Sequence, residues 1–362
     1  MGGWSPAEDK MATTRRSIVA VCRMWKEIGM EFQHEFINIP TWRGGEERID
    51  GLIRLFKASM TASSQGHGWW TKRINCNIEV LSRTQYVEKL FELLELCHNL
   101  GSFTVIGRAD IALSIRTRLA HTLQTRFSHS LRRFECAPTG NALGDLVLPA
   151  LPLRSLTILA CGSYLDKPDC PSFNTITTLS LHAPYSFESN LSHPRLYFPR
   201  LRTLAVLYPK TTGILLLQSF FERHNRTLKN LYLLTGNFIK DLPEIFRGGT
   251  GIQWLTLNWQ DLYHLVRAVE EGLIPLVGIQ RLGIVRAKQE DVEKVLRPAI
   301  MRVIERKALP DLVVLRFMCL ISPVRFQTNR WRVIIQKCLE NQVKLEDSRG
   351  RAVEVWGGDT QR

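Results

Sequence analysis

Residues 228–233 read Leu-Lys-Asn-Leu-Tyr-Leu, and this arrangement of apolar residues, apolar-x-x-apolar-x-apolar, recurs along most of the chain. The last two apolar residues of each copy alternate around one other residue, which places both on one face of a short strand. A weaker copy is Leu100-Phe103-Val105, and a further one lies at Ile74-Cys76. The eight clear copies start at residues 131, 153, 176, 201, 228, 252, 279 and 312.

The spacing of these copies and the residues between them predict a repeat protein. Successive copies start 22, 23, 25, 27, 24, 27 and 33 residues apart, and leucine-rich repeats recur about every 20–29 residues with the core L-x-x-L-x-L. Residues between the copies have the apolar spacing of helices. The sequence therefore predicts an α/β solenoid of the leucine-rich-repeat type, with parallel strands on the concave face and helices on the convex face. The helical faces lie at residues 86–97, 262–269, 292–304 and 331–338.

The alternative is an ordinary α/β domain, in which strands and helices alternate around a doubly wound sheet. Such a fold also buries apolar strands. It gives no reason, however, to repeat one template of six residues at nearly constant spacing. The repeat pattern therefore favours the solenoid.

Composition limits the classes to which this protein can belong. The 362 residues carry a formal net charge of +14, with 44% hydrophobic and 23% charged residues, which is typical of a globular protein. No apolar run approaches the ~18 residues of a membrane helix, and the first residues lack the features of a signal peptide. The eight cysteines form no C-x-x-C pair, which indicates reduced thiols and a cytoplasmic or nuclear protein.

The sequence contains none of the common catalytic motifs. The Walker loop, G-x-G-x-x-G, G-x-S-x-G and H-E-x-x-H are all absent, and the nine histidines are dispersed. We therefore expect no enzyme activity, no cofactor and no metal site. An active site assembled from residues distant in sequence is the alternative that motifs do not exclude.

Residues 18–28 read Ile-Val-Ala-Val-Cys-Arg-Met-Trp-Lys-Glu-Ile and have the apolar spacing of a helix. This stretch resembles the second half of an F-box. Followed by the extended residues 36–39 and a leucine-rich array, it is similar to the F-box proteins of fungi, especially of basidiomycetes. The L-P-x-E-[IL]-L helix that opens an F-box has no counterpart in residues 1–11. The same helix could instead be an end cap of the solenoid.

This resemblance implies a substrate receptor of a cullin-type ubiquitin ligase. Val21, Cys22 and Trp25 would then contact a Skp-type adaptor. The domain organisation that follows is a partial F-box at residues 12–40, a linking helix and loop at 41–70, and the solenoid at 71–362. Within the linking segment, residues 59–68 have the composition of a loop.

The residues between the apolar positions predict a binding surface on the concave face. In the eight clear copies these positions hold seven basic residues and one acidic residue, Glu135. Such a surface favours an acidic or phosphorylated peptide. Alternatively, these arginines simply face water. A nucleic-acid partner is disfavoured because basic residues form no run longer than two. The candidate contact residues are Arg132, Arg154, Arg202, Lys229, Tyr232, Trp254, Arg281 and Arg316.

Overall fold

The structure is a computed structural model. The chain divides into two compact units, Met1–Tyr164 and Leu165–Arg362. The residues that the structure describes are 34–39, 45–62, 66–77, 84–106, 112–136, 153–158, 174–182, 197–207, 220–234, 246, 251–273, 278–285, 297–305, 308–318 and 329–353.

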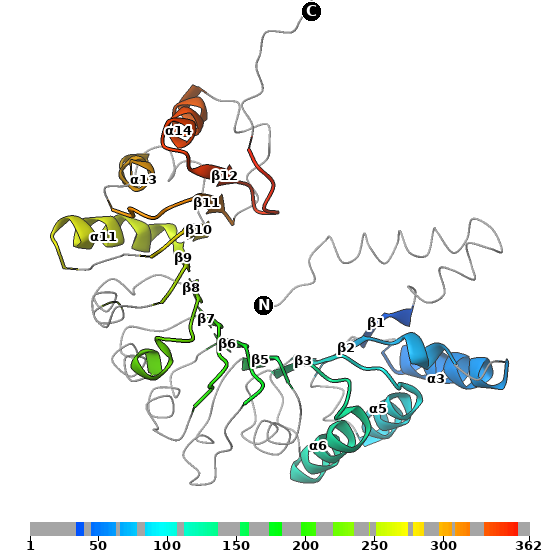
Figure 1. The fold of residues 1–362 in the computed structure, drawn as a ribbon. Helices are drawn as coiled ribbons and strands as arrows, with labels where there is room; N and C mark the ends of the chain where they lie inside the picture. Colours follow the sequence, from blue (N-terminus) through cyan, green and yellow to red (C-terminus); the bar gives the residue numbers. More distant parts are fainter. Residues whose placement is uncertain are drawn as a thin grey trace, which may run out of the picture. The chain divides into compact units, whose positions relative to one another are not determined.

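The first unit contains parallel strands that pair in the order in which they occur in the chain. Figure 1 shows its helices on one side of these strands. The strands are β1 (Phe36–Ile39), β2 (Arg73–Asn77), β3 (Ser102–Ile106), β4 (Arg133–Cys136) and β5 (Ser155–Ile158). The helices are α3 (Gly45–Ala62), α5 (Thr84–Leu96) and α6 (Leu113–Phe127), and a 3-10 helix, η1, spans His67–Trp70.

The second unit repeats this arrangement with further parallel strands, again paired in chain order. Its described helices also lie on one side of the strands (Figure 1). The strands are β6 (Thr178–His182), β7 (Thr203–Leu207), β8 (Asn230–Leu233), β9 (Trp254–Asn258), β10 (Arg281–Val285), β11 (Val314–Phe317) and β12 (Lys344–Glu346). The helices are α11 (Trp259–Glu270), α13 (Arg297–Ile304) and α14 (Asn329–Glu340).

The strand register places the six-residue template in rows across each sheet. We number its residues as positions one to six, so that Leu255 and Leu257 of β9 occupy positions four and six. Leu255 pairs with Leu231 on one side and with Leu282 on the other, and all three are fully buried. Position three and position five point to the opposite face, which we call the open face, because side chains alternate along a strand.

Burial of the apolar rows supplies the main stabilisation of each unit. Position one is also buried, as at Leu131, Leu228 and Leu312, so a repeat such as residues 228–233 contributes three side chains to the core. Burying one such side chain contributes about 1.5–3 kcal/mol. Helices complete the core with the faces that the sequence predicts, for example Leu262, Leu265 and Val266 of α11.

Strand order and helix placement confirm the α/β solenoid-like fold for each unit. A doubly wound sheet would reverse its strand order and carry helices on both faces, whereas the neighbours here follow the chain. All eight clear copies form strands, and so do the weaker copies at Phe103 and Ile74.

Three details differ from the sequence-based expectation. Helix α6 was not predicted, because its large buried side chains, Leu119, Leu123 and Phe127, recur only every four residues, with the small Ala120 beside them. Strand β12 was missed because its copy of the template is short. Helix α3 continues to Ala62 through the predicted loop; Ser59 Oγ within it donates to Phe56 O at 2.7 Å and accepts from His67 N at 2.7 Å.

The cysteines Cys76, Cys97 and Cys338 are buried free thiols. Burial raises the pKa of each to about 12, so these three are protonated and unreactive at neutral pH. No helix in the described ranges is both long and apolar enough to cross a bilayer. The partial F-box residues Val21, Cys22 and Trp25 lie outside the described residues.

Candidate functional site: an arginine and tryptophan cluster

The candidate contact residues fall into two groups in the structure. Arg132, Arg154, Arg202 and Lys229 occupy position two, immediately before their strands begin. The other group lies within strands of the second unit and faces the open side of the sheet. It consists of Tyr232 and Arg316 at position five, and Trp254 and Arg281 at position three.

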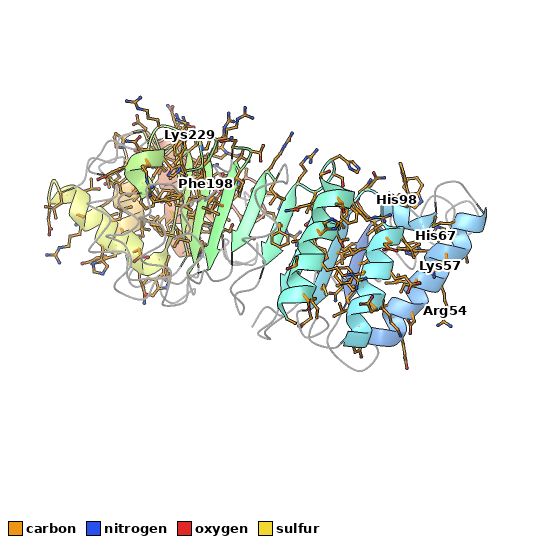
Figure 2. All side chains as sticks on the ribbon, turned by 90° about the horizontal axis from the view of Figure 1, so that it is seen from below. Arg54, Lys57, His67, His98, Phe198 and Lys229 are labelled. Carbon is orange, nitrogen blue, oxygen red and sulfur yellow. The ribbon has the colours of Figure 1, made fainter. Side chains whose placement is uncertain are left out.

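The position-two residues line the end of each sheet where the strands start. Their backbones form a ladder: Arg154 N donates to Arg132 O at 2.8 Å, and Lys229 N donates to Arg202 O at 2.8 Å. In Figure 2, Lys229 lies at the end of the second unit's strands from which the arrows start. The Arg132 guanidinium turns back to donate to His129 O at 2.6 Å. Arg132 and Arg154 belong to the first unit, so the structure does not gather all eight candidates into one site.

The open-face group of the second unit forms a single cluster around Trp254. The Tyr232 and Trp254 ring centroids are 5.6 Å apart. Two guanidinium groups lie over the Trp254 ring, with the Cζ of Arg316 at 5.0 Å and the Cζ of Arg281 at 5.7 Å from its centroid. A cation within about 6 Å of an aromatic centroid is attracted by the ring. We call Tyr232, Trp254, Arg281 and Arg316 the Trp254 cluster.

A glycine lets Arg316 reach Trp254 across an intervening strand. Arg316 lies on β11 and Trp254 on β9, and between them Gly283 of β10 is paired with Thr256 and with Arg316. A Cβ atom at Gly283 would lie 2.6 Å from Thr256 Oγ1, which is too close for any side chain. The missing side chain leaves the path across β10 open to the long Arg316 side chain.

Strand β12 adds two charged residues that the sequence-based prediction missed. Glu346 is paired with Arg316 at position five, and Lys344 precedes it at position three. Arg316 donates to Glu346 Oε2 through Nε at 2.9 Å and through Nη2 at 2.5 Å. Lys344 Nζ lies 2.8 Å from Glu346 Oε1. The only sequence signal was the alternation of Val343, Leu345 and their polar neighbours, which is too short to stand out.

The charges of these groups follow from their surroundings. Burial alone would raise the pKa of Glu346, but hydrogen bonds from Lys344 and Arg316 outweigh it and hold this pKa below its usual range. Glu346 is therefore ionised at neutral pH. Burial raises the pKa of Tyr232, while the nearby Arg316 and Arg281 act in the opposite direction, so its hydroxyl remains protonated.

Arg281 differs from Arg316 because it has no carboxylate partner among the described residues. Its guanidinium lies over the Trp254 ring and acts electrostatically on Tyr232, and the residue is exposed. Two buried polar atoms next to it, Trp254 Nε1 and Thr256 Oγ1, also lack a hydrogen-bond partner in the described part of the chain. An unsatisfied buried donor costs about 1–3 kcal/mol.

The described residues contain no group of three His, Cys, Asp or Glu side chains placed to hold a metal ion. The chemistry of the Trp254 cluster is that of recognition. Its guanidinium groups suit a carboxylate or phosphate oxygen, and its rings supply apolar contact area.

Comparison with solved structures supports the assignment of the fold. The chain is similar to the leucine-rich repeat-containing protein LegL7 from Legionella pneumophila, with a TM-score of 0.51 and 14% sequence identity. The similarity covers 83% of this chain and 97% of that one. No family model and no curated protein sequence matches the chain. The fold is therefore of the leucine-rich-repeat type.

Proposed function

We propose that this protein is a non-catalytic interaction protein that binds an acidic segment of a protein partner at the Trp254 cluster. The observation that carries the proposal is Arg281, an exposed guanidinium lying on Trp254 without a carboxylate partner among the described residues. Leucine-rich-repeat folds present one strand face without helices, which gives a partner a broad surface.

The residue types of the cluster are those that contribute most to protein interfaces. Trp, Tyr and Arg are enriched among residues whose truncation costs at least about 2 kcal/mol of binding energy. Trp254 and Tyr232 are rigid and partly buried, so little side-chain entropy is lost when a partner covers them. Arg281 would pair with a carboxylate of the partner, and the apolar neighbours of that carboxylate would cover the rings.

Binding of a model acidic peptide tests this proposal. We expect fluorescein-labelled hexaglutamate to bind the full chain, measured by fluorescence anisotropy. Arg281→Gln should weaken binding at least tenfold, and Trp254→Ala should weaken it at least as much. Arg133→Gln is the matched control, because Arg133 occupies position three of β4 in the first unit and already contacts Glu135 at 3.3 Å. Equal losses for Arg281→Gln and Arg133→Gln would indicate unspecific attraction by the net charge and would contradict the proposal.

We also propose a role as an F-box substrate receptor of a cullin-type ubiquitin ligase, in the cytoplasm or nucleus, resembling fungal F-box proteins. The supporting observation is the sequence of residues 21–25, Val-Cys-Arg-Met-Trp. In this role the N-terminal helix holds a Skp-type adaptor while the repeats hold the substrate, which raises the substrate concentration near the ligase.

Co-purification with a Skp-type adaptor tests the ligase role. Trp25→Ala should abolish capture of the adaptor, whereas Trp4→Ala, which lies outside the motif, should leave it unchanged. If the helix is only an end cap of the repeats, the wild type captures no adaptor, and Trp25→Ala instead lowers the melting temperature. A nucleic-acid role would appear as binding to random duplex DNA that weakens steeply with salt.

A further inference from the structure

Glu346 occupies an anion position inside the candidate site. Both of its carboxylate oxygens are held by cations of the same sheet: Oε2 by Arg316 at 2.5 and 2.9 Å, and Oε1 by Lys344 at 2.8 Å. Only 8% of its side chain is exposed. Bonds between ionised partners are the strongest hydrogen bonds in proteins, so an external anion does not easily displace this carboxylate.

The two arginines of the Trp254 cluster are therefore unequal. Arg316 contacts the same ring as Arg281, but its charge is already neutralised by Glu346. Arg281 is exposed, and no carboxylate among the described residues neutralises its charge. The cluster together with β12 carries three positive charges and one negative charge, and the negative charge lies between two of the positive ones.

A second negative charge brought to this surface would meet repulsion from Glu346. A peptide carboxylate carries one charge and needs one guanidinium. A phosphorylated side chain carries about −1.5 to −2 charges at pH 7 and binds best to several cations at once. With Arg316 and Lys344 both engaged by Glu346, the site has one free cation among its described residues, which suits the single charge of a carboxylate.

We infer that Glu346 is a specificity-determining residue, which fills the anion position between Arg316 and Lys344 and so selects carboxylate-bearing peptides over phosphorylated ones. This inference rests on the proposed binding of acidic segments at the Trp254 cluster. It adds that the acidic partner is recognised through Asp, Glu or terminal carboxylates.

Two labelled peptides test the inference with the full chain. One is hexaglutamate, and the other replaces its third glutamate with phosphoserine. The wild type should bind the phosphoserine peptide no more tightly than hexaglutamate. Glu346→Gln keeps the size of the side chain but frees Arg316 and Lys344, so the affinity for the phosphoserine peptide relative to hexaglutamate should rise about tenfold.

Two controls separate release of the cations from a general change in charge. The triple variant with Arg316→Gln, Lys344→Gln and Glu346→Gln removes the two cations together with the carboxylate that they hold and should keep the wild-type preference. Glu135→Gln removes a carboxylate from position five of β4 in the first unit and should also leave the preference unchanged.

The outcomes distinguish the inference from the proposed function. A wild type that binds hexaglutamate, with the same preference in Glu346→Gln, overturns the inference and leaves the proposed function standing. A wild type that binds neither peptide contradicts the proposed function. If Glu346→Gln does not fold, the wild-type protein alone still tests the inference. Binding of the phosphoserine peptide at least threefold more tightly than hexaglutamate by the wild type would overturn it.

Discussion

The open faces of the two units share one backbone pattern but differ in how their arginines are engaged. In the first unit, Arg73 lies over Phe36 with its Cζ 5.0 Å from the ring centroid and donates to Asn75 Oδ1 at 3.1 Å. Arg133 lies 3.3 Å from Glu135. In the second unit, the Arg281 guanidinium lies over the Trp254 ring and has no carboxylate partner within the described ranges.

This difference shows which parts of a repeat are free to vary. Positions one, four and six are buried in repeats of both units, for example at Leu100, Phe103 and Val105 and at Leu228, Leu231 and Leu233, and changing these residues removes core contacts. Positions three and five face away from the helices, so an exposed side chain there, such as Arg281, can change without removing contacts of the apolar core. A binding site can therefore be built on the open face of one unit without a change in its apolar core.

The largest effect is expected from a substitution in the core of one unit. It tests whether the two units unfold independently of each other. Trp331 of α14 is 1% exposed and meets Phe317 edge to face at 5.0 Å. Trp331→Ala should cost about 3–5 kcal/mol because it leaves a large cavity. The backbone amides of β10 to β12 should then exchange their hydrogens faster with solvent. Faster exchange in β2 to β4 as well would show that the units unfold together.

A smaller effect is expected at the glycine that opens the path for Arg316. Gly283→Ala places a Cβ atom 2.6 Å from Thr256 Oγ1, and a threonine has few alternative rotamers. We expect a loss of about 1–3 kcal/mol in urea unfolding, together with weaker binding of hexaglutamate. Gly101→Ala is the control in the first unit, because its nearest neighbour, Lys72 O, would be 3.6 Å away. Equal stability of the two variants would contradict the close approach.

Acid should destabilise both units, the first of them through His34. Burial, and secondarily the neighbouring His67, lower the pKa of His34 to about 4. A lowered pKa means that the folded state binds fewer protons than the unfolded state, so stability falls as the pH drops from about 6.5 towards 4. Between pH 6.5 and 5.5 we expect a loss on the order of 1 kcal/mol, measured by urea unfolding.

A substitution at His34 checks this assignment. His34→Gln should flatten the acid dependence of the first unit. The stability of the second unit should still fall in acid, because burial lowers the pKa of His224. His224 accepts from Phe198 N through Nε2 at 3.0 Å, and protonation of that nitrogen breaks this hydrogen bond. If the stability of the first unit depends on pH in His34→Gln as it does in the wild type, other groups cause its acid sensitivity.

The smallest effect is expected for the exposed ion pairs that connect successive helices. Glu88 of α5 pairs with Arg118 of α6 at 2.5 Å in the first unit, and Glu270 of α11 pairs with Arg302 of α13 in the second. Glu88→Gln and Glu270→Gln should each cost about 0.2–1 kcal/mol. The cost should disappear in 1 M salt, where charges are screened within about 3 Å. A loss that persists in salt would point to packing contributions.

Much of the fold was predictable because it depends on a local pattern. The apolar template at residues 131–317 determines which side chains are buried, and Leu231, Leu255 and Leu282 lie in the core where the pattern placed them. Helix α6 and strand β12 were not predictable, because a narrow stripe and a short alternation also occur by chance. Their place is decided by the neighbouring repeats, which supply the surface on which they pack.

The sequence by itself determined the repeat, its period and the basic character of the residues between the apolar positions. Only the tertiary structure decided which of those residues meet. Parallel pairing brings positions about 20–35 residues apart to within about 4.8 Å of each other, so Trp254, Arg281, Arg316 and Glu346 are gathered through strand register. Register depends on long-range packing, and for this reason the cluster and its internal carboxylate have no signature in the linear sequence.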